Sequence, residues 1–305
     1  MDNYTNEVCL RGNYRGRVLG KEEVSQFPYN CIGVIKARTK YSFANGTGTL
    51  VGKSTVVTAA HNFFSISSTG IFEPTSVIFC PGVFKDYEEE EIYKVKSYHI
   101  PEEFKEIERK IAKEKDENKQ KKLKRESERY DYAVMILEDK IEREKYPMLY
   151  PNFKQDGQFV RLSGYSNPNP LTDKPGYFPS EHSGLLEYSS TGGEYDIDTI
   201  GGHSGSPVFF IDQCFVVGTH KGGQTKKKNY CTLMTSEVIK NIRKWANGEH
   251  VNVFEGEQSQ NQGEEIKKLR KDRNYFKDKY EQLRNKYEDL ERQHYVLFQV
   301  PKFDQ

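Results

Sequence analysis

Three short segments of the sequence carry residue types that together could catalyse acyl transfer. In chain order they are residues 58–61 (TAAH), 131–133 (DYA) and 201–207 (GGHSGSP). A serine hydroxyl is a poor nucleophile at neutral pH unless a base takes its proton, and that base needs an acid to hold its tautomer. His61, Asp131 and Ser204 are of the types that fill these three roles.

The glycines around Ser204 would let the backbone turn sharply and aim the N–H groups of Gly202 and Ser204 at an oxyanion. Taken alone, a GxSxG motif also occurs in α/β-hydrolases, where the chain order is serine, acid, histidine. Here the order is histidine, acid, serine, and the neighbouring segments read as strands. The combination of the three motifs therefore favours a serine hydrolase built on β-structure.

The elements that must position these residues lie between residues 18 and 250. Short β-branched and aromatic runs alternate there with Gly, Pro and Asn, which predicts many short strands in a barrel or sandwich. The clearest runs are residues 31–35, 48–51, 54–57, 76–79, 133–137, 207–211 and 215–218. One helix is predicted over residues 236–245, where apolar residues follow helical spacing before an Asn-Gly stop.

The composition divides the chain into further parts. Residues 1–17 form a polar, basic arm or propeptide. Residues 102–130 are rich in Lys and Glu, which predicts a charged helical insertion within the 18–250 domain; a solvated insertion is favoured over a binding arm. Residues 251–263 read as a polar linker, and residues 264–298 as a coiled coil.

The coiled-coil prediction rests on a seven-residue repeat of large apolar side chains. It runs through Leu269, Phe276, Leu283, Leu290 and Leu297. Because so narrow an apolar stripe needs another helix to cover it, we expect self-association or a partner helix. The alternative is a helix that packs back on its own domain, and the oligomeric state stays open.

Global properties exclude several classes of protein. The chain has 305 residues, 30% of them charged, and no apolar run approaches the length of about 20 residues that a membrane span needs. A net charge of +1 gives no reason to expect a nucleic-acid partner. The start of the sequence lacks the apolar run of a secretory signal, so we expect a cytoplasmic protein. The alternative is a secreted protein whose signal has been removed.

The cysteines are dispersed, as Cys9, Cys31, Cys80, Cys214 and Cys231. No CxxC pair and no histidine cluster is present, so neither a zinc site nor a thioredoxin-like site is predicted. Free thiols in a reducing compartment are favoured, with one disulfide left open.

Four stretches of the sequence resemble a trypsin-like serine peptidase of the chymotrypsin fold, and more closely its glutamyl endopeptidase branch. They are residues 18–29, 46–61, 195–207 and 217–223. The resemblance covers about residues 18–248. It implies an all-β fold of two six-stranded antiparallel barrels with the active site in the cleft between them, to which the charged helical insertion and the C-terminal coiled-coil helix are added.

The resemblance also implies roles for individual residues. His61 would be the general base, Asp131 would orient it, and Ser204 would attack the peptide bond to form an acyl-enzyme, with no cofactor or metal. Gly202 and Ser204 would form the oxyanion hole. Asp86 is the rival acid, but residues 86–89 lack the apolar strand that follows Asp131. The substrate would be a protein or peptide.

The specificity implied by the resemblance has two readings. His220 and Thr199 stand where glutamyl endopeptidases contact an acidic side chain, which favours cleavage after Glu or Asp. Asp198 stands where trypsin keeps the carboxylate that binds Arg or Lys, which favours basic residues instead. A catalytically silent, peptidase-like binding or scaffold protein is the third reading.

The Arg17–Val18 bond resembles a processing site. In trypsin-type zymogens the new amino terminus pairs with an acid just before the nucleophile, but His203 stands there in this chain. In the glutamyl branch the free terminus lies near the substrate pocket instead. We therefore expect removal of residues 1–17 to raise activity, with an arm that is never removed as the alternative.

Overall fold

The computed structural model describes residues 16–85, 91–152, 154, 157–166, 177–189, 192–210, 214–225 and 228–255, together with Gln282 and Lys286. The chain divides into two units, Met1–Phe254 and Glu255–Gln305. Of the predicted coiled coil, only Gln282 and Lys286 are described, and both are helical and exposed. The rest of residues 264–298, the arm before residue 16 and the linker after residue 255 lie outside the described residues. No helix in the described part is long and apolar enough to cross a membrane.

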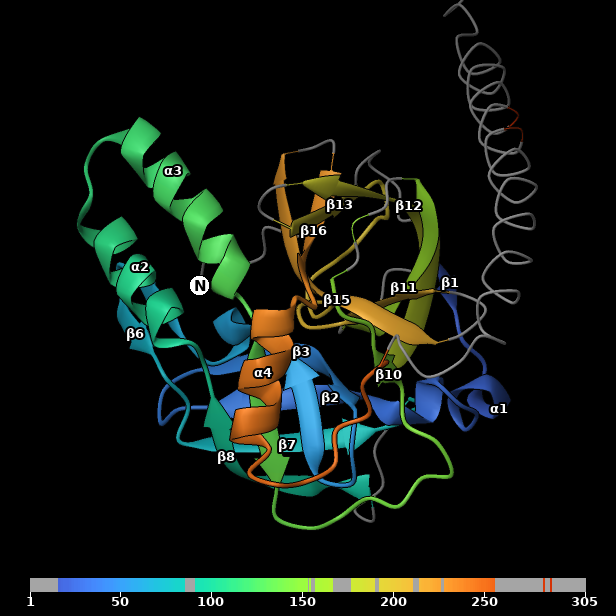
Figure 1. Ribbon diagram of the computed structural model, residues 1–305. Helices are drawn as coiled ribbons and strands as arrows, with labels where there is room; N and C mark the ends of the chain where they lie inside the picture. Colours follow the sequence, from blue (N-terminus) through green and yellow to red (C-terminus); the bar gives the residue numbers. More distant parts are fainter. Residues whose placement is uncertain are drawn as a thin grey trace, which may run out of the picture. The chain divides into compact units, whose positions relative to one another are not determined.

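The first half of the Met1–Phe254 unit is a closed barrel of antiparallel strands in the order β2-β3-β4-β9-β8-β7 (Figure 1). Strands β4 and β9 are almost wholly buried, because they have neighbours on both faces. The strands are β2 (Ile32–Arg38), β3 (Phe43–Leu50), β4 (Thr55–Thr58), β7 (Ser76–Pro81), β8 (Tyr93–His99) and β9 (Ala133–Leu137).

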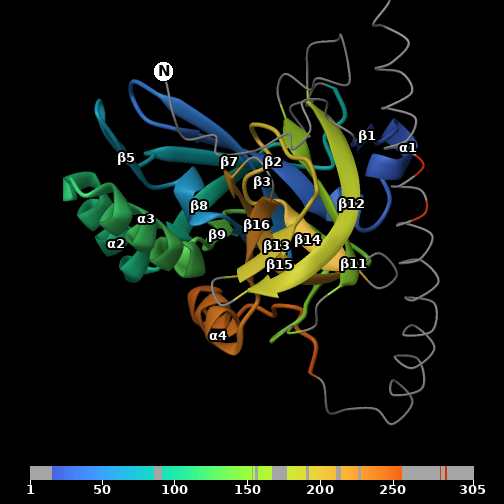
Figure 2. The same cartoon turned by 90° about the horizontal axis from the view of Figure 1, so that it is seen from above.

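The second half forms another ring of strands, in the order β12-β11-β14-β15-β16-β13, which closes because β12 pairs with both β11 and β13 (Figure 2). Two short strands add to its edges, β1 on β12 and β10 on β15. The fold is therefore the double barrel that the family resemblance implied. The strands are β1 (Arg17–Val18), β10 (Met148–Leu149), β11 (Gln158–Ser166), β12 (Phe178–Ser189), β13 (Gly192–Tyr195), β14 (Pro207–Phe210), β15 (Phe215–Thr225) and β16 (Lys228–Leu233).

One hydrophobic cluster joins the two barrels and helix α4 (Ser236–Trp245). It combines Val57 and Val134 of the first barrel with Phe209 of the second and Ile242 of α4, all at most 2% exposed. Burial of this apolar surface fixes the barrels against one another, so residues on facing loops keep a defined separation. The remaining short elements are α1 (Lys21–Val24), β5 (Ser65–Ser67), β6 (Gly70–Phe72) and the 3-10 helices Tyr29–Cys31, Ala60–Asn62 and Glu128–Tyr130.

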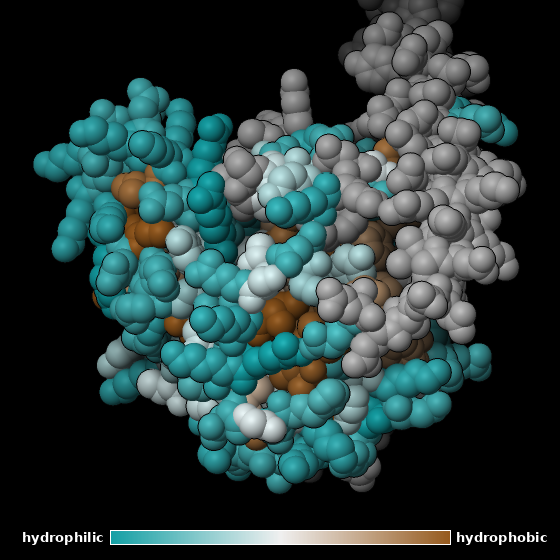
Figure 3. Space-filling model, in the orientation of Figure 1, coloured by the Kyte–Doolittle hydropathy of each residue, from teal (hydrophilic) through white to brown (hydrophobic). Residues whose placement is uncertain are grey.

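Two helices, α2 (Glu102–Lys113) and α3 (Glu117–Ser127), occupy the charged segment between β8 and β9. Helix α2 buries Phe104 and Ile107 on one face. Helix α3 begins after Asp116, whose carboxylate accepts hydrogen bonds from two backbone N–H groups of the first turn. The outer surface of both helices is mainly hydrophilic (Figure 3). The insertion therefore packs on the domain through a small apolar contact. Its end leads directly into the segment before Asp131.

The buried carboxylate of Glu181, on β12, ties the start of the domain to the second barrel. It accepts hydrogen bonds from Tyr29 Oη (2.6 Å) and Arg17 Nε (2.8 Å), and Arg161 Nε lies 3.2 Å away. Arg17 also pairs with Glu23 at 2.9 Å. The Arg17–Val18 bond thus lies in a paired strand, and a peptidase acting on it would first have to free β1 from β12.

We expect Glu181→Gln to lower the free energy of unfolding by about 2 kcal/mol, because the amide leaves several charged and hydroxyl donors poorly matched. Glu187→Gln on the same strand is the control, since its ion pair with Lys228 is exposed and should contribute less than about 0.5 kcal/mol. Urea unfolding of both variants measures the difference. Equal stability losses would contradict the role assigned to Glu181.

Candidate active site

His61 lies on the 3-10 turn directly after β4, where the chain leaves the first barrel. Its ring Nδ1 is 2.7 Å from Asp131 Oδ2, and its backbone N–H donates to Asp131 Oδ1 at 3.0 Å. Both carboxylate oxygens of Asp131 therefore hold the same residue, so the ring is fixed in place and in tautomer. With Nδ1–H directed at the carboxylate, Nε2 is left as an acceptor.

Ser204 completes the group from the other barrel. Its Oγ lies 2.6 Å from His61 Nε2, and the residue is 8% exposed. A hydroxyl with this partner can pass its proton to the ring as it attacks an electrophile. The structure thus brings together His61, Asp131 and Ser204. The rival acid, Asp86, lies outside the described residues.

The loop that carries Ser204 depends on two glycines with positive φ, Gly202 (+103°) and Gly205 (+88°). A Cβ on Gly202 would lie 2.6 Å from the carbonyl oxygen of Tyr165, so any side chain there would force the backbone to shift. The predicted oxyanion donors, the N–H groups of Gly202 and Ser204, belong to this turn. Its shape therefore requires glycine on both sides of the serine.

The first barrel anchors the same loop. The backbone N–H of Thr47 donates to the carbonyl of Ser204 at 2.8 Å, and its hydroxyl donates to the carbonyl of Gly202 at 2.8 Å. Asn62 Nδ2 also donates to the carbonyl of Ser204, at 3.1 Å. These three hydrogen bonds fix the nucleophile turn of the second barrel against the first barrel.

Asp131 is 6% exposed, and burial by itself would raise its pKa. The charge of His61 and the hydrogen bonds from it outweigh burial, so the pKa of Asp131 lies below its ordinary value. The carboxylate is therefore ionised at neutral pH and favours a protonated His61 ring. This is the electrostatic arrangement that a general base needs.

Two of the predicted specificity residues have unpaired polar atoms in the described part of the chain. His220, on β15, is fully buried and its Nδ1 lies 2.6 Å from Tyr195 Oη. Its other ring nitrogen, Nε2, has no hydrogen-bond partner there, and neither has the buried hydroxyl of Thr199. Burial holds the pKa of His220 well below its usual value, so the ring is neutral.

The third predicted specificity residue, Asp198, is also fully buried. Its backbone N–H donates to Nδ1 of His182, on β12, at 2.9 Å. Asp198 precedes Thr199 on the segment that leads to the nucleophile turn, so all three predicted specificity residues belong to the second barrel.

His203, next to the nucleophile, serves as a structural histidine. Its Nε2 lies 3.1 Å from Ser180 Oγ, and its Nδ1 accepts from the backbone N–H of Ile200 at 3.1 Å. Burial lowers its pKa to about 3, so the ring stays neutral. Ser180 pairs with Val18 across β1 and β12. Strand β1 is thereby linked to His203, the residue beside Ser204.

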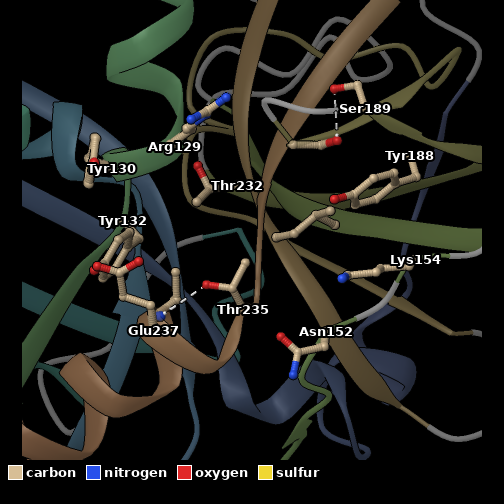
Figure 4. A pocket seen from close by; sticks show the side chains of 13 residues that line it. Arg129, Tyr130, Tyr132, Asn152, Lys154, Tyr188, Ser189, Thr232, Thr235 and Glu237 are labelled. Atoms are coloured by element: carbon tan, nitrogen blue, oxygen red, sulfur yellow. Dashed lines mark hydrogen bonds between the residues drawn. The ribbon is translucent and has the colours of Figure 1, made fainter.

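A pocket of about 310 Å³ opens beside the segment that carries Asp131 (Figure 4). Arg129 and Lys154 come from opposite walls, and Tyr130 and Tyr132 line one side. The pocket is lined by none of His61, Ser204 and His220. It comes close to Asp131, because Tyr130 and Tyr132 flank that residue in the chain and the hydroxyl of Thr232 donates to its carbonyl at 3.1 Å.

Within the described ranges, no three His, Cys, Asp or Glu side chains are grouped as a metal site would require. The four described cysteines, Cys31, Cys80, Cys214 and Cys231, are free thiols.

The model of the trypsin-like peptidase domain family matches residues 46–219, more than half of the chain. The chain belongs to this family. The matched stretch includes His61, Asp131 and Ser204.

The glutamyl endopeptidase of Bacillus licheniformis is 27% identical over 233 residues, which are 72% of this chain and 64% of that protein. The chain therefore spans just under two thirds of the length of this curated relative. A solved Glu endopeptidase superimposes with a TM-score of 0.61 at 21% identity, covering 77% of this chain and 98% of that one. A mutant of human heparin binding protein, at 13% identity, has a TM-score of 0.51 and covers 77% and 95%. These structures establish the chymotrypsin-like fold.

Sequence reasoning missed several residues that shape the site. Thr47 and Asn62 hold the nucleophile turn, Tyr195 holds His220, and a buried ion pair of Lys221 with Glu128 lies beside Asp131. The sequence contains one usable signal, a lysine within the strand that carries His220. The other three contacts join distant segments and leave no local pattern.

We expect acid to destabilise the protein partly through His203. Because its folded pKa of about 3 is below the unfolded value, the unfolded chain binds more protons between these values, so stability falls as pH drops. Between about pH 7 and pH 4 the parent should lose about 3 kcal/mol more than His203→Gln. Urea unfolding across pH measures this. His250→Gln, at an exposed position, should follow the parent; identical profiles for all three would contradict the assignment.

Proposed function

We propose that this trypsin-like family member is a serine endopeptidase. The observation that carries the proposal is the 2.6 Å contact between Ser204 Oγ and His61 Nε2, with Asp131 holding the opposite ring nitrogen. Ser204 Oγ attacks the peptide carbonyl while His61 takes its proton, and the N–H groups of Gly202 and Ser204 stabilise the resulting oxyanion. His61 then protonates the leaving amine. Water, deprotonated by His61, hydrolyses the acyl-enzyme and restores Ser204.

We further propose cleavage after Glu, or Asp, with His220 and Thr199 binding the acidic side chain. The support is the pair of buried, unpartnered atoms, His220 Nε2 and Thr199 Oγ1, since a carboxylate would satisfy both. Tyr195 keeps the ring of His220 in position from the other side, at 2.6 Å. A bound carboxylate would favour the tautomer of His220 that carries its proton on Nε2, with Nδ1 facing the hydroxyl of Tyr195. The curated relative that is 27% identical to this chain is named glutamyl endopeptidase, in agreement with this proposal.

We also propose a working division of the chain. Residues 18–250 are the peptidase domain, residues 1–17 an arm or propeptide, residues 251–263 a linker and residues 264–298 a coiled coil for self-association or a partner helix. The charged hairpin of residues 102–130 belongs to the peptidase domain.

The mechanism predicts that Ser204→Ala lowers kcat/KM on a peptide substrate by about 10⁴-fold or more. A fluorophosphonate probe should add one adduct to the parent and none to Ser204→Ala, as intact-mass measurement would show. Ser25→Ala, at an exposed serine, is the control and should match the parent. A folded parent that neither cleaves peptides nor reacts with the probe would support a silent binding module in place of an enzyme.

The specificity proposal predicts preferential cleavage after Glu in a panel of chromogenic peptides with Glu, Asp, Arg, Lys or Phe before the bond. His220→Leu should lower kcat/KM for the Glu peptide by about 10- to 100-fold, as expected for one lost hydrogen bond to a charged group. Asp198→Asn should retain the preference. Cleavage after Arg or Lys that is lost in Asp198→Asn would instead assign the specificity to Asp198.

A further inference from the structure

A buried cation that the proposed mechanism does not use lies next to His220. The side chain of Lys221 is 5% exposed, and its Nζ lies 3.1 Å from Glu128 Oε2 and 3.4 Å from the Glu128 carbonyl. The pairing of β15 with β16 shifts register between His220 and Gly222, so Lys221 sits in a bulge. A bulge lets neighbouring side chains be aimed at different targets. Here His220 contacts Tyr195, and Lys221 reaches toward the other barrel.

Glu128 belongs to the short segment that carries Asp131. It begins the 3-10 turn Glu128–Tyr130, which follows α3 and immediately precedes Asp131. Thr232, on β16, donates its hydroxyl to the carbonyls of Glu128 (2.9 Å) and Asp131 (3.1 Å). Two residues of the second barrel, Lys221 and Thr232, therefore hold a segment of the first.

The charges around this segment are arranged close to His61. Burial raises the pKa of Glu128 and lowers that of Lys221, and in each case the charge of the other residue opposes the shift. Burial raises the pKa of Asp131, and His61 lowers it more than any other group does. Lys221 adds a smaller lowering of the same pKa. Glu108, on α2, completes the surroundings: it accepts from Ser127 Oγ at 2.7 Å, and burial raises its pKa. Among the described residues, the ionisable groups that act on the His61–Asp131 pair include Glu108, Glu128, Lys221 and His220.

Stability alone does not account for this pair. Taking a lysine and a glutamate out of water costs about as much as their attraction returns, and apolar residues of similar size often stabilise a core equally well. Moreover, Glu128 Oε1 is buried with no hydrogen-bond partner among the described residues. A buried pair of this kind is better suited to fixing one specific arrangement of the segments it joins.

We propose that Lys221 and Glu128 are positioning residues: their ion pair holds the Asp131 segment of the first barrel against β15 of the second and thereby sets the alignment of His61 with Ser204. This inference rests on the proposed peptidase function. The pair also places one positive and one negative charge near His61, so removing either partner changes the electrostatic field at the ring in opposite directions.

The test compares kcat, KM and the pH dependence of kcat/KM for Lys221→Met and Glu128→Gln. Both should lower kcat by about 10- to 100-fold with a change in KM below about 3-fold, because alignment of the reacting groups is impaired more than binding. The acidic limb of the kcat/KM profile should shift to higher pH by about 0.5 to 1 unit in Lys221→Met, because acids remain near His61. It should shift to lower pH by a similar amount in Glu128→Gln, because the charge of Lys221 is then unopposed.

Two further variants separate alignment from charge. Lys221→Arg keeps the cation and should restore most of the kcat. The double variant Lys221→Met/Glu128→Leu removes both charges, so its acidic limb should return toward that of the parent while its kcat stays low. Lys228→Met is the control, because its pair with Glu187 is on the surface, and it should match the parent throughout.

The outcomes distinguish the two proposals. A folded parent that fails to react with a fluorophosphonate probe overturns the peptidase function itself. An active parent whose folded Lys221→Met and Glu128→Gln variants keep the parental kcat and acidic limb overturns the positioning role. If Lys221→Met does not fold, the near-isosteric variants Glu128→Gln and Lys221→Arg decide. The positioning role is supported if Glu128→Gln has a low kcat and a pH profile whose acidic limb is shifted down, while Lys221→Arg has a near-parental kcat. Any other result overturns the positioning role.

Discussion

The two hydrogen bonds between Asp131 and His61 are the contacts on which the rest of the site depends. One carboxylate bonds both the ring and the backbone amide of the histidine, at 2.7 and 3.0 Å. The ring then has a single orientation, with Nε2 directed at Ser204. Since the acid and the base come from one barrel and the nucleophile from the other, these two bonds are useful only while the barrels keep their separation. The shared hydrophobic cluster and the polar contacts between the barrels supply that constraint.

Those polar contacts run in both directions between the barrels. The first barrel reaches over through Thr47, which bonds the carbonyls of Ser204 and Gly202. The second barrel reaches back through Thr232 and Lys221, which bond the segment before Asp131. Each half of the site is therefore shaped partly by side chains of the other half. Pre-organisation of this kind reduces the rearrangement needed when a transition state forms.

The sequence predicted the buried elements better than the exposed ones. Strand β9 and helix α4 occupy the predicted residues 133–137 and 236–245, because burial on several sides gave them apolar patterns. Strand β8, in which Lys94 and Lys96 alternate with Tyr93 and Val95, was missed because its outer face is polar. The three residues that form the His61 group followed from short motifs. The pair of Lys221 and Glu128 lies 93 positions apart, and its one sequence signal, a lysine within the strand that carries His220, does not name its partner.

The helical hairpin of α2 and α3 has a consequence for how this fold tolerates change. Both of its ends return to the first barrel, and the returning end is secured by Ser127 and Glu128 before the chain reaches Asp131. Because extra length in a surface connection costs little entropy once its ends are fixed, the part of the hairpin between Glu108 and Ser127 can be lengthened or shortened with little effect on the acid. The fixed base of the hairpin is therefore a position where new surface can be added next to a reactive centre while that centre is left intact.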